Sequence, residues 1–127
     1  MKTVLVAGGF DPIEASHIEY FKEAKKLGDQ LVVIMHSDEW IKRNKGEIVI
    51  PRYDRSTIIS NLNMVDSIIV IFDDTDDTAI DAIKHAQMRY PNDEIIFAVK
   101  GDSTKTMIPE MMVPNVLFKF GVGKETD

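Results

Sequence analysis

Hydrophobic residues along the chain gather in five short runs, separated by longer stretches with helical periodicity. The runs are rich in β-branched residues and are mostly unbroken by polar ones, which is typical of strands buried on both faces of a sheet. They predict strands over residues 3–7, 31–35, 67–72, 94–99 and 115–120.

The stretches between these runs repeat apolar residues every three or four positions, which predicts amphipathic helices. The predicted helices span residues 16–27, 38–43, 52–62, 78–89 and 103–112. In the first, Ser16 and Glu19 have the spacing of a capping box, and Gly28 stands where a glycine commonly ends a helix. The last helix is expected to be short.

Strands and helices alternate in the order β-α-β-α-α-β-α-β-α-β. This order implies right-handed crossovers and a parallel sheet. We therefore predict an α/β fold, a Rossmann-like three-layer sandwich of about five parallel strands with helices on both faces, in one domain over residues 1–127. Ligands of such sheets bind at the carboxyl ends of the strands. Here that edge gathers residues 8–17, 36–38, 73–78 and 100–104.

Composition narrows the possible functions. The 127 residues are 44% hydrophobic and 28% charged, as in an ordinary globular protein. The apolar runs are too short to cross a membrane and the N-terminus lacks the pattern of a secretory signal, so we expect a cytoplasmic protein. The absence of cysteine excludes disulfides and thiol catalysis, and no histidine pairing predicts a structural metal. A net charge of -6 argues against a nucleic-acid partner.

The sequence GGFDPIEASH at residues 8–17 joins the first predicted strand to the first predicted helix. A glycine-rich loop at this position of an α/β sheet binds phosphate through backbone amides and the helix N-terminus. Gly8 and Gly9 suit either a phosphate cradle or a simple tight turn. Asp11 suits orientation of the loop, a base or ribose contact, or local turn capping. His17 suits a phosphate contact or a half-buried place in the helix.

This loop and three later motifs together resemble a known family. GGFDPIEASH is similar to a strand–loop–helix motif of the form G-x-F-D-x-x-H-x-G-H. The segments EAKKLGDQLVVIMHSDEW, KGEIVIPRYDRSTIISNLNMVDSIIV and FAVKGDSTK follow in the family's order and spacing. By these motifs the chain resembles the nucleotidyltransferase superfamily, specifically small cytidylyltransferases of the glycerol-3-phosphate type.

The resemblance implies a reaction of CTP with a phosphorylated alcohol, giving a CDP-alcohol and pyrophosphate, with Mg²⁺ as cofactor. It implies a homodimer, whereas the net charge and the short apolar runs predict that there is no nucleic-acid or membrane partner. The implied catalytic residues are His17, Lys45 and Arg55, with Lys42 as a second candidate loop lysine. The implied nucleotide-binding residues are Gly8, Gly9, Phe10, Asp11, Glu14, Ser16, Asp102 and Ser103. The implied substrate-binding residues are Asp38, Trp40 and Asp66. The candidate dimer contacts are Ile48, Ile50, Met111, Met112 and Val113.

Two positions of the first motif depart from this family. Glu14 stands where the family has its first histidine, and Ser16 stands where it has glycine. Like charges about 4 Å apart repel by roughly 4 kcal/mol at an effective dielectric constant near 20, and the serine adds a side chain where phosphate approaches the backbone. Close relatives also carry an arginine at the position of Ser103. They have a Ser/Thr-rich segment that would begin where this sequence reads FGVGKETD. These departures predict impaired activity.

Several alternatives stay open. The chain could be a catalytically inactive or engineered module of the same fold, or an active but divergent enzyme. Glu14 with Asp11 could serve a changed chemistry, such as binding a metal or a cationic substrate. A receiver-like domain would use Asp11 and Lys100, but the acidic pair expected before Asp11 is missing. A flavodoxin would have a Ser/Thr-rich phosphate-binding loop after the first strand, where this chain has Gly-Gly-Phe-Asp.

Overall fold

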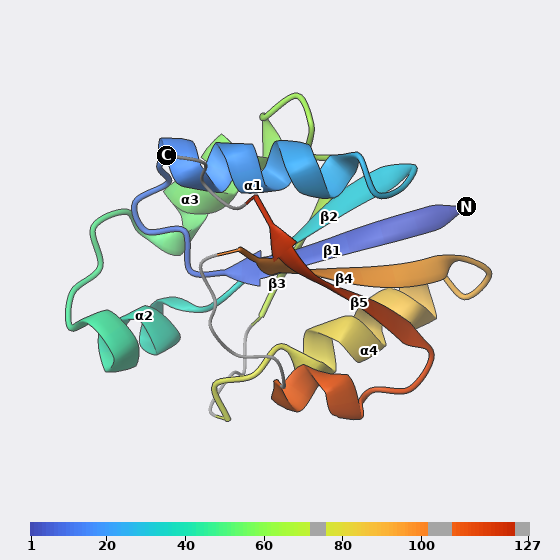
Figure 1. Ribbon diagram of the computed structural model, residues 1–127. Coiled ribbons are helices and arrows are strands. Elements are labelled where there is room, and N and C mark those ends of the chain that lie inside the picture. The colour runs from blue at the N-terminus through green and yellow to red at the C-terminus, as the bar shows by residue number, and fades with distance from the viewer. Residues whose placement is uncertain (72–75, 102–107, 124–127) are drawn as a thin grey trace.

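Five parallel strands form one sheet in the computed structural model, which describes residues 1–71, 76–101 and 108–123 (Figure 1). The strands are β1 (Lys2–Gly8), β2 (Gln30–Met35), β3 (Ser67–Val70), β4 (Glu94–Lys100) and β5 (Val116–Val122). Their order is β3-β2-β1-β4-β5, and every neighbouring pair is parallel. The chain reverses its direction of progress across the sheet between β1 and β4, so these two strands flank the switch point where such folds bind ligands.

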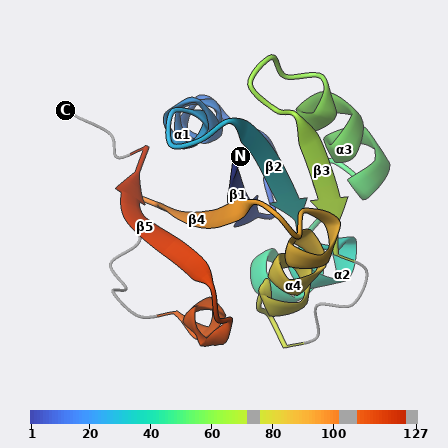
Figure 2. The same ribbon diagram turned by 90° about the vertical axis from the view of Figure 1, so that its right-hand side faces the viewer.

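Helices cover both faces of the sheet. They are α1 (Ala15–Lys25), α2 (Asp38–Lys45), α3 (Arg52–Ser60), α4 (Ile80–Arg89) and the short 3-10 helix η1 (Pro109–Met112). Figure 2 shows α1 and α3 on one face, with α4 and η1 on the other. Figure 1 shows α2 on the side toward which the strand arrows point. The predicted α/β three-layer fold is therefore confirmed.

The central strand explains why the sequence shows unbroken apolar runs. Val4 and Val6 of β1 pack into one hydrophobic cluster with Phe21 of α1, whereas Leu5 packs into the other with Ile83 of α4. All five of these side chains are fully buried. Because successive side chains of a strand point to opposite faces, a strand covered on both faces needs apolar residues at every position.

The start and end of α1 differ from the prediction. The helix begins at Ala15 and its N-cap is Glu14, so Ser16 lies inside the first turn and the predicted Ser16–Glu19 capping box is wrong. The C-cap is Lys26 rather than a residue at Gly28. Gly28 instead lies against β1, where an added Cβ would stand 2.9 Å from the carbonyl oxygen of Lys2.

The last predicted helix is only partly seen. Within the described residues, the 103–112 segment contributes the 3-10 helix Pro109–Met112, and residues 102–107 lie outside the described part. Glu110 of this short helix accepts a hydrogen bond of 2.9 Å from the amide of Ala79, the N-cap of α4. None of the helices in the described ranges is long and apolar enough to cross a membrane.

Candidate functional site

The loop after β1 is shaped by two aromatic rings that pack against its glycines. Phe10 has a left-handed backbone (φ 53) and folds its buried ring back over Gly8, where a Cβ would meet the ring at 2.9 Å. A Cβ on Gly9 would stand 3.0 Å from the indole of Trp40. A left-handed conformation is strained for a bulky residue, so packing holds this loop in place. The two glycines make room for side chains at the carboxyl end of β1.

The N-cap of α1 is the residue that departs most from the family motif. Glu14 and His17 form a reciprocal capping box, in which Nδ1 of His17 accepts a hydrogen bond of 3.0 Å from the Glu14 amide. With Nδ1 used as an acceptor, the proton of a neutral imidazole lies on Nε2. The carboxylate of Glu14 therefore stands at the positive end of α1, where an anionic ligand would otherwise bind.

Asp11 ties this loop to the segment between α2 and α3. Its buried carboxylate accepts hydrogen bonds from the amides of Val49 (2.8 Å) and Ile50 (2.6 Å). These residues are 38 and 39 positions away along the chain. The sequence suggested that Asp11 orients its own loop. The structure shows that it orients a different one, the loop at residues 46–51.

Arg55 of α3 is the most connected side chain of the site. Its Nε donates to the carbonyl of Ile50 (2.9 Å), and its Nη1 donates to the carbonyl of Gly9 (2.6 Å). Both Nη1 and Nη2 lie 3.3 Å from the carbonyl of His36, and Nη2 also contacts Oδ1 of Asp38 at 2.7 Å. One guanidinium thus joins the ends of β1 and β2 to the loop that precedes α3.

This geometry changes the role expected for Arg55 and Asp38. The resemblance predicts a phosphate contact for Arg55 and a substrate contact for Asp38. The arginine is only 1% exposed, and its five N–H groups are matched by five hydrogen bonds to protein oxygens. Asp38 neutralises it and also accepts a hydrogen bond of 3.3 Å from the amide of Arg52. In this arrangement the Arg55 guanidinium holds backbone carbonyls in place, and Asp38 holds Arg55.

A stacked pair of rings lies beside this cluster. The imidazole of His36 and the indole of Trp40 are parallel within 12°, with centroids 4.2 Å apart. The Nε1 atom of Trp40 is buried and has no hydrogen-bond partner among the described residues. The sequence motifs place His36 at the ligand-binding edge but give it no specific role, although it directly follows a predicted strand and stands four residues before Trp40. A buried, unpaired N–H is a candidate donor for a ligand or water.

The predicted loop lysines lie on the exposed side of α2. Lys42 and Lys45 are exposed, and Lys45 is the last residue of the helix. Gly46 follows with φ 88 and has no atom within 4 Å of an added Cβ. Arg43, between the two lysines, pairs with Asp77 at 2.8 Å. The lysines are therefore placed at the carboxyl-edge side of the molecule, at the start of the loop that Asp11 holds at its other end.

Asp66 lies away from this site. It immediately precedes β3, at the amino ends of the strands, and it pairs with Lys25 and accepts a hydrogen bond of 2.8 Å from the amide of Leu31. Partial burial acts to raise the pKa of Asp66, but the two hydrogen bonds and the positive charge of Lys25 together lower it, so the net shift is downward. This position replaces the predicted substrate contact with a structural role. Asp102 and Ser103 lie outside the described residues.

The described residues do not form a protein cage for Mg²⁺. No group of three or more histidine, aspartate or glutamate side chains comes together in the part of the chain that the structure describes. The two buried or half-buried carboxylates of the site, Asp11 and Asp38, already accept hydrogen bonds from protein groups. The same engagement argues against a metal or cation site built from Glu14 and Asp11.

Comparison with curated proteins places the chain among nucleotidyltransferases. It is 41% identical to FAD synthase of Pyrococcus horikoshii over 68 residues, which covers 53% of this chain and 46% of that enzyme. It is 34% identical to the bifunctional protein HldE of Helicobacter pylori over 112 residues, which covers 84% of this chain and 24% of HldE. The chain thus matches less than half the length of either relative.

Comparison with solved structures agrees with the fold. A lipopolysaccharide core biosynthesis protein from Thermoplasma volcanium superposes with a TM-score of 0.69 at 28% identity, covering 94% of this chain and 95% of that chain. The sequence also matches the family described as Cytidylyltransferase-like over residues 5–122. With its five parallel strands, its glycine loop at the switch point and this match over nearly its whole length, the chain belongs to the Cytidylyltransferase-like family.

Proposed function

We propose that the carboxyl edge of the sheet is a nucleoside triphosphate site whose nucleotidyl transfer is impaired by Glu14. In the reaction implied by the resemblance, a phosphate oxygen of a phosphorylated alcohol bonds to the α-phosphorus of CTP. The bond from that phosphorus to the bridging oxygen breaks, and pyrophosphate leaves with the electron pair. Such a transfer needs positioning and charge stabilisation rather than a protein nucleophile.

The capping box of α1 is the observation that carries this proposal. The N-terminus of a helix attracts phosphate because its first amides lack partners and its dipole is positive there. In this chain Glu14 supplies that negative charge from within the protein. A triphosphate at the same place would meet a carboxylate instead of a second histidine, which lowers affinity and the stabilisation of developing charge.

The remaining residues support a retained binding site. His17 lies in the first turn of α1, and its Nδ1 accepts a hydrogen bond from the Glu14 amide, which fixes the orientation of the imidazole at the helix N-terminus. Lys42 and Lys45 supply positive charge at the near end of the 46–51 loop. Asp11 and Arg55 are positioning residues, since they hold that loop against Gly9 and His36. Trp40 presents an unpaired N–H beside them.

The proposal also covers the metal ion and the identity of the nucleobase. Mg²⁺ is expected to arrive bound to the triphosphate, because Mg²⁺ sites of this kind use substrate phosphates with few protein ligands. CTP is the nucleotide implied by the sequence resemblance. The similarity to FAD synthase, whose product contains an adenine nucleotide, makes ATP the second candidate. Both nucleotides therefore belong in the test.

The test is calorimetric titration of CTP–Mg²⁺ and ATP–Mg²⁺ into the unmodified chain and a Glu14→His, Ser16→Gly variant. We expect the variant to bind one nucleotide roughly tenfold or more tightly than the unmodified chain. Replacing Glu14 removes its repulsion of the triphosphate, and a gain of about 1.4 kcal/mol in binding free energy is a tenfold change in the dissociation constant. Glu19→His is the matched control, because Glu19 is an exposed glutamate one turn further along α1. The control should change affinity by less than threefold.

The outcomes separate the alternatives. If the variant gains affinity and releases pyrophosphate with a panel of phosphorylated alcohols, the chain is a transferase disabled at its first motif. If the unmodified chain binds and turns over as well as the variant, the repulsion argument fails and the chain is an active divergent enzyme. If neither protein binds either nucleotide, the site is not a nucleotide site and a non-catalytic module takes its place.

A further inference from the structure

The last residue of β4 is a lysine at the switch point of the sheet. β1 ends at Gly8, and its neighbour β4 ends at Lys100. The last paired residues of these two strands are Leu5 and Phe97, each three positions before the end of its strand. Gly8 and Lys100 therefore stand at the same level of the carboxyl edge. Ligands of such sheets bind beside the two strands that flank this point.

The register of the sheet places Lys100 on the face that α1 covers. Along β4, Ile96 and Ala98 belong to the hydrophobic cluster that contains Phe21 of α1, so the alternation of side chains places Lys100 on the same face. The partner of Lys100 in β5 is Val122, which belongs to that cluster too. The register shifts by one residue between Ala98 and Lys100, but the extra residue is in β5, so the alternation along β4 is unbroken.

Lys100 also stands level with the first turn of α1. The hydroxyl of Tyr20 donates a hydrogen bond to the carbonyl of Ala98, which fixes the height at which the helix crosses β4. Lys100 is two strand residues from Ala98, about 7 Å nearer the carboxyl edge. His17 is three helix residues from Tyr20, about 4.5 Å nearer the same edge, because α1 begins there. The half-buried lysine has a long flexible stem, so its ammonium is within reach of the end of α1 that carries Glu14.

Positive charges therefore flank the glycine loop from two sides. In the strand order β3-β2-β1-β4-β5, the two neighbours of β1 are β2 and β4. The exposed Lys42 and Lys45 lie on α2, which follows β2, whereas Lys100 ends β4. A triphosphate along the loop after β1 would lie between these charges. Lys100 is the cation on the α1 face, where the Glu14 carboxylate opposes an anion.

We infer that Lys100 is a phosphate-binding residue of the candidate site, and that its charge offsets part of the repulsion from Glu14. A lysine ammonium donates charge-assisted hydrogen bonds to phosphate oxygens, which are stronger than bonds between neutral groups. The inference rests on the proposed nucleotide function and adds to it a contact from β4 that the sequence motifs did not assign. It requires that nucleotide affinity depends on the charge of Lys100.

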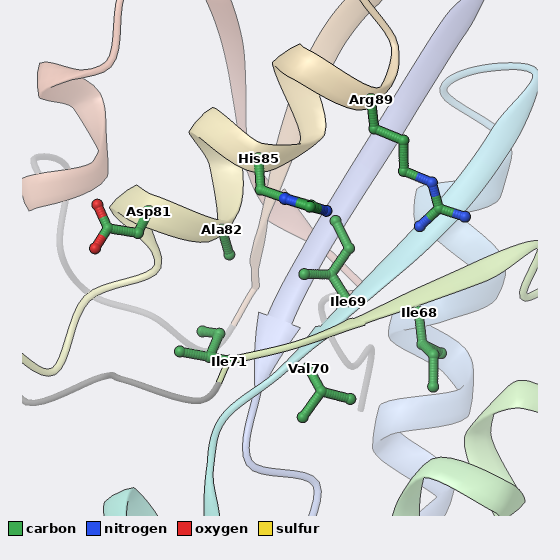
Figure 3. Close-up of a pocket in the computed structure, with 8 residues that line it drawn as sticks. All are labelled: Ile68, Ile69, Val70, Ile71, Asp81, Ala82, His85 and Arg89. Atoms are coloured by element: carbon green, nitrogen blue, oxygen red, sulfur yellow. The ribbon is translucent and has the colours of Figure 1, made fainter.

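A competing place for an anion lies between β3 and α4. Figure 3 shows this cavity, which has a volume of about 470 Å³, with the side chain of His85 beside Ile69 and Arg89 toward one end of the helix. Its size suits a small ligand. Arg89 therefore provides the matched control, because Arg89→Met removes the same charge as Lys100→Met at an exposed position of α4.

The test is calorimetric titration of CTP–Mg²⁺ and ATP–Mg²⁺ into the Glu14→His, Ser16→Gly chain, with and without each further substitution. Lys100→Met should weaken binding of the preferred nucleotide roughly tenfold or more, the loss expected for a hydrogen bond between charged groups. Arg89→Met should weaken it by less than about threefold, because it lies away from the glycine loop. The effect of Lys100→Met should shrink as salt is raised from about 0.05 to 0.5 M, since salt screens a charge contact but not a packing defect.

Each outcome decides the inference separately from the proposed function. Circular dichroism verifies that the variants are folded, and Lys100→Gln replaces the methionine variant if that one is not. If nucleotide binding survives Lys100→Met unchanged, or if the loss does not depend on salt, the inference is overturned while the nucleotide site stands. A loss with Arg89→Met instead assigns the nucleotide to the β3–α4 cavity and also overturns it. If the Glu14→His, Ser16→Gly chain binds neither nucleotide, the proposed function fails and this inference fails with it.

Discussion

The residue that organises the candidate site is a buried arginine rather than a histidine. Arg55 holds the carbonyls of Gly9, His36 and Ile50, so it connects three segments that are distant in the sequence. Replacing Arg55 by lysine or alanine would leave several buried oxygens without hydrogen-bond donors. The resulting loss of folding free energy is larger than the net contribution of the Arg55–Asp38 ion pair. The sequence resemblance singled out Arg55, but only the tertiary structure shows that its guanidinium supports the backbone of three segments.

Arg55→Lys is therefore expected to lower the free energy of unfolding by about 3 kcal/mol. Lysine keeps the charge but has three donors on a flexible stem and cannot span the four acceptors that the planar guanidinium reaches. Urea denaturation followed by circular dichroism measures the change. Arg43→Lys is the control, since Arg43 makes an exposed ion pair with Asp77 and the change should cost less than about 1 kcal/mol. Equal losses in the two variants would contradict the assigned role.

The elements of this fold are joined by close backbone contacts at the end of β5. Gly123 has a left-handed backbone (φ 70), and an added Cβ would stand 2.6 Å from the Cα of Tyr20 in α1. The hydroxyl of Tyr20 in turn donates to the carbonyl of Ala98 in β4. The helix α1 is thus fastened to the β4–β5 half of the sheet by one glycine contact and one buried hydrogen bond.

Comparing Gly121 with Gly123 separates the steric cost of an added Cβ from the cost of a left-handed backbone. Gly121 also has a left-handed backbone (φ 77) but nothing within 4 Å of an added Cβ. Gly121→Ala should cost about 1 kcal/mol, the conformational penalty alone. Gly123→Ala should cost at least about 1 kcal/mol more, because Tyr20 backbone must also move. Thermal unfolding measures both, and equal losses would show that α1 is not packed against this position.

At the scale of the whole molecule, the carboxyl and amino ends of the strands carry polar residues with different contacts. The carboxyl edge gathers Asp11, His36 and Arg55, which form the candidate site. The amino edge is held by hydrogen bonds between elements, including those from Lys25 of α1 and the amide of Leu31 in β2 to Asp66. Polar groups that looked equivalent in the sequence therefore lie at opposite edges of the sheet, some at the candidate site and others in contacts between elements.

The lowered pKa of Asp66 predicts how stability depends on pH. A carboxyl whose pKa is lower in the folded chain contributes its stabilisation above the unfolded pKa near 4, and this contribution is lost as pH falls through the folded pKa. Asp66→Asn should therefore be less stable than the unmodified chain at pH 7, by at most about 1 kcal/mol because Asp66 is partly exposed. The difference should shrink below about pH 4.

Denaturation at a series of pH values checks this expectation. The control is Glu94→Gln, which removes an exposed carboxyl at the start of β4 and should change the free energy of unfolding at pH 7 by less than about 0.5 kcal/mol. A difference between Asp66→Asn and the unmodified chain that stays constant from pH 7 to acidic pH would show that the Asp66 charge is not what stabilises this edge.

The sequence by itself determined the fold and the edge of the sheet at which a ligand site is expected. Unbroken apolar runs such as that around Val4 and Leu5 require strands covered on both faces, and their alternation with helices allows few topologies. A glycine loop after the first strand then falls at the carboxyl edge. These features depend on local periodicity, which a sequence records directly, and the structure and the matched family confirm the fold.

Only the tertiary structure decided which residues meet. Asp11 and Val49 are 38 positions apart, and Arg55 reaches Gly9 over 46 positions. No spacing rule marks such pairs. The sequence likewise could not show that Asp66 lies at the opposite edge, or that Glu14 rather than Ser16 caps α1. These facts depend on how strands are ordered and on where a helix begins, because a hydrogen bond is set by distance in space and not by separation along the chain.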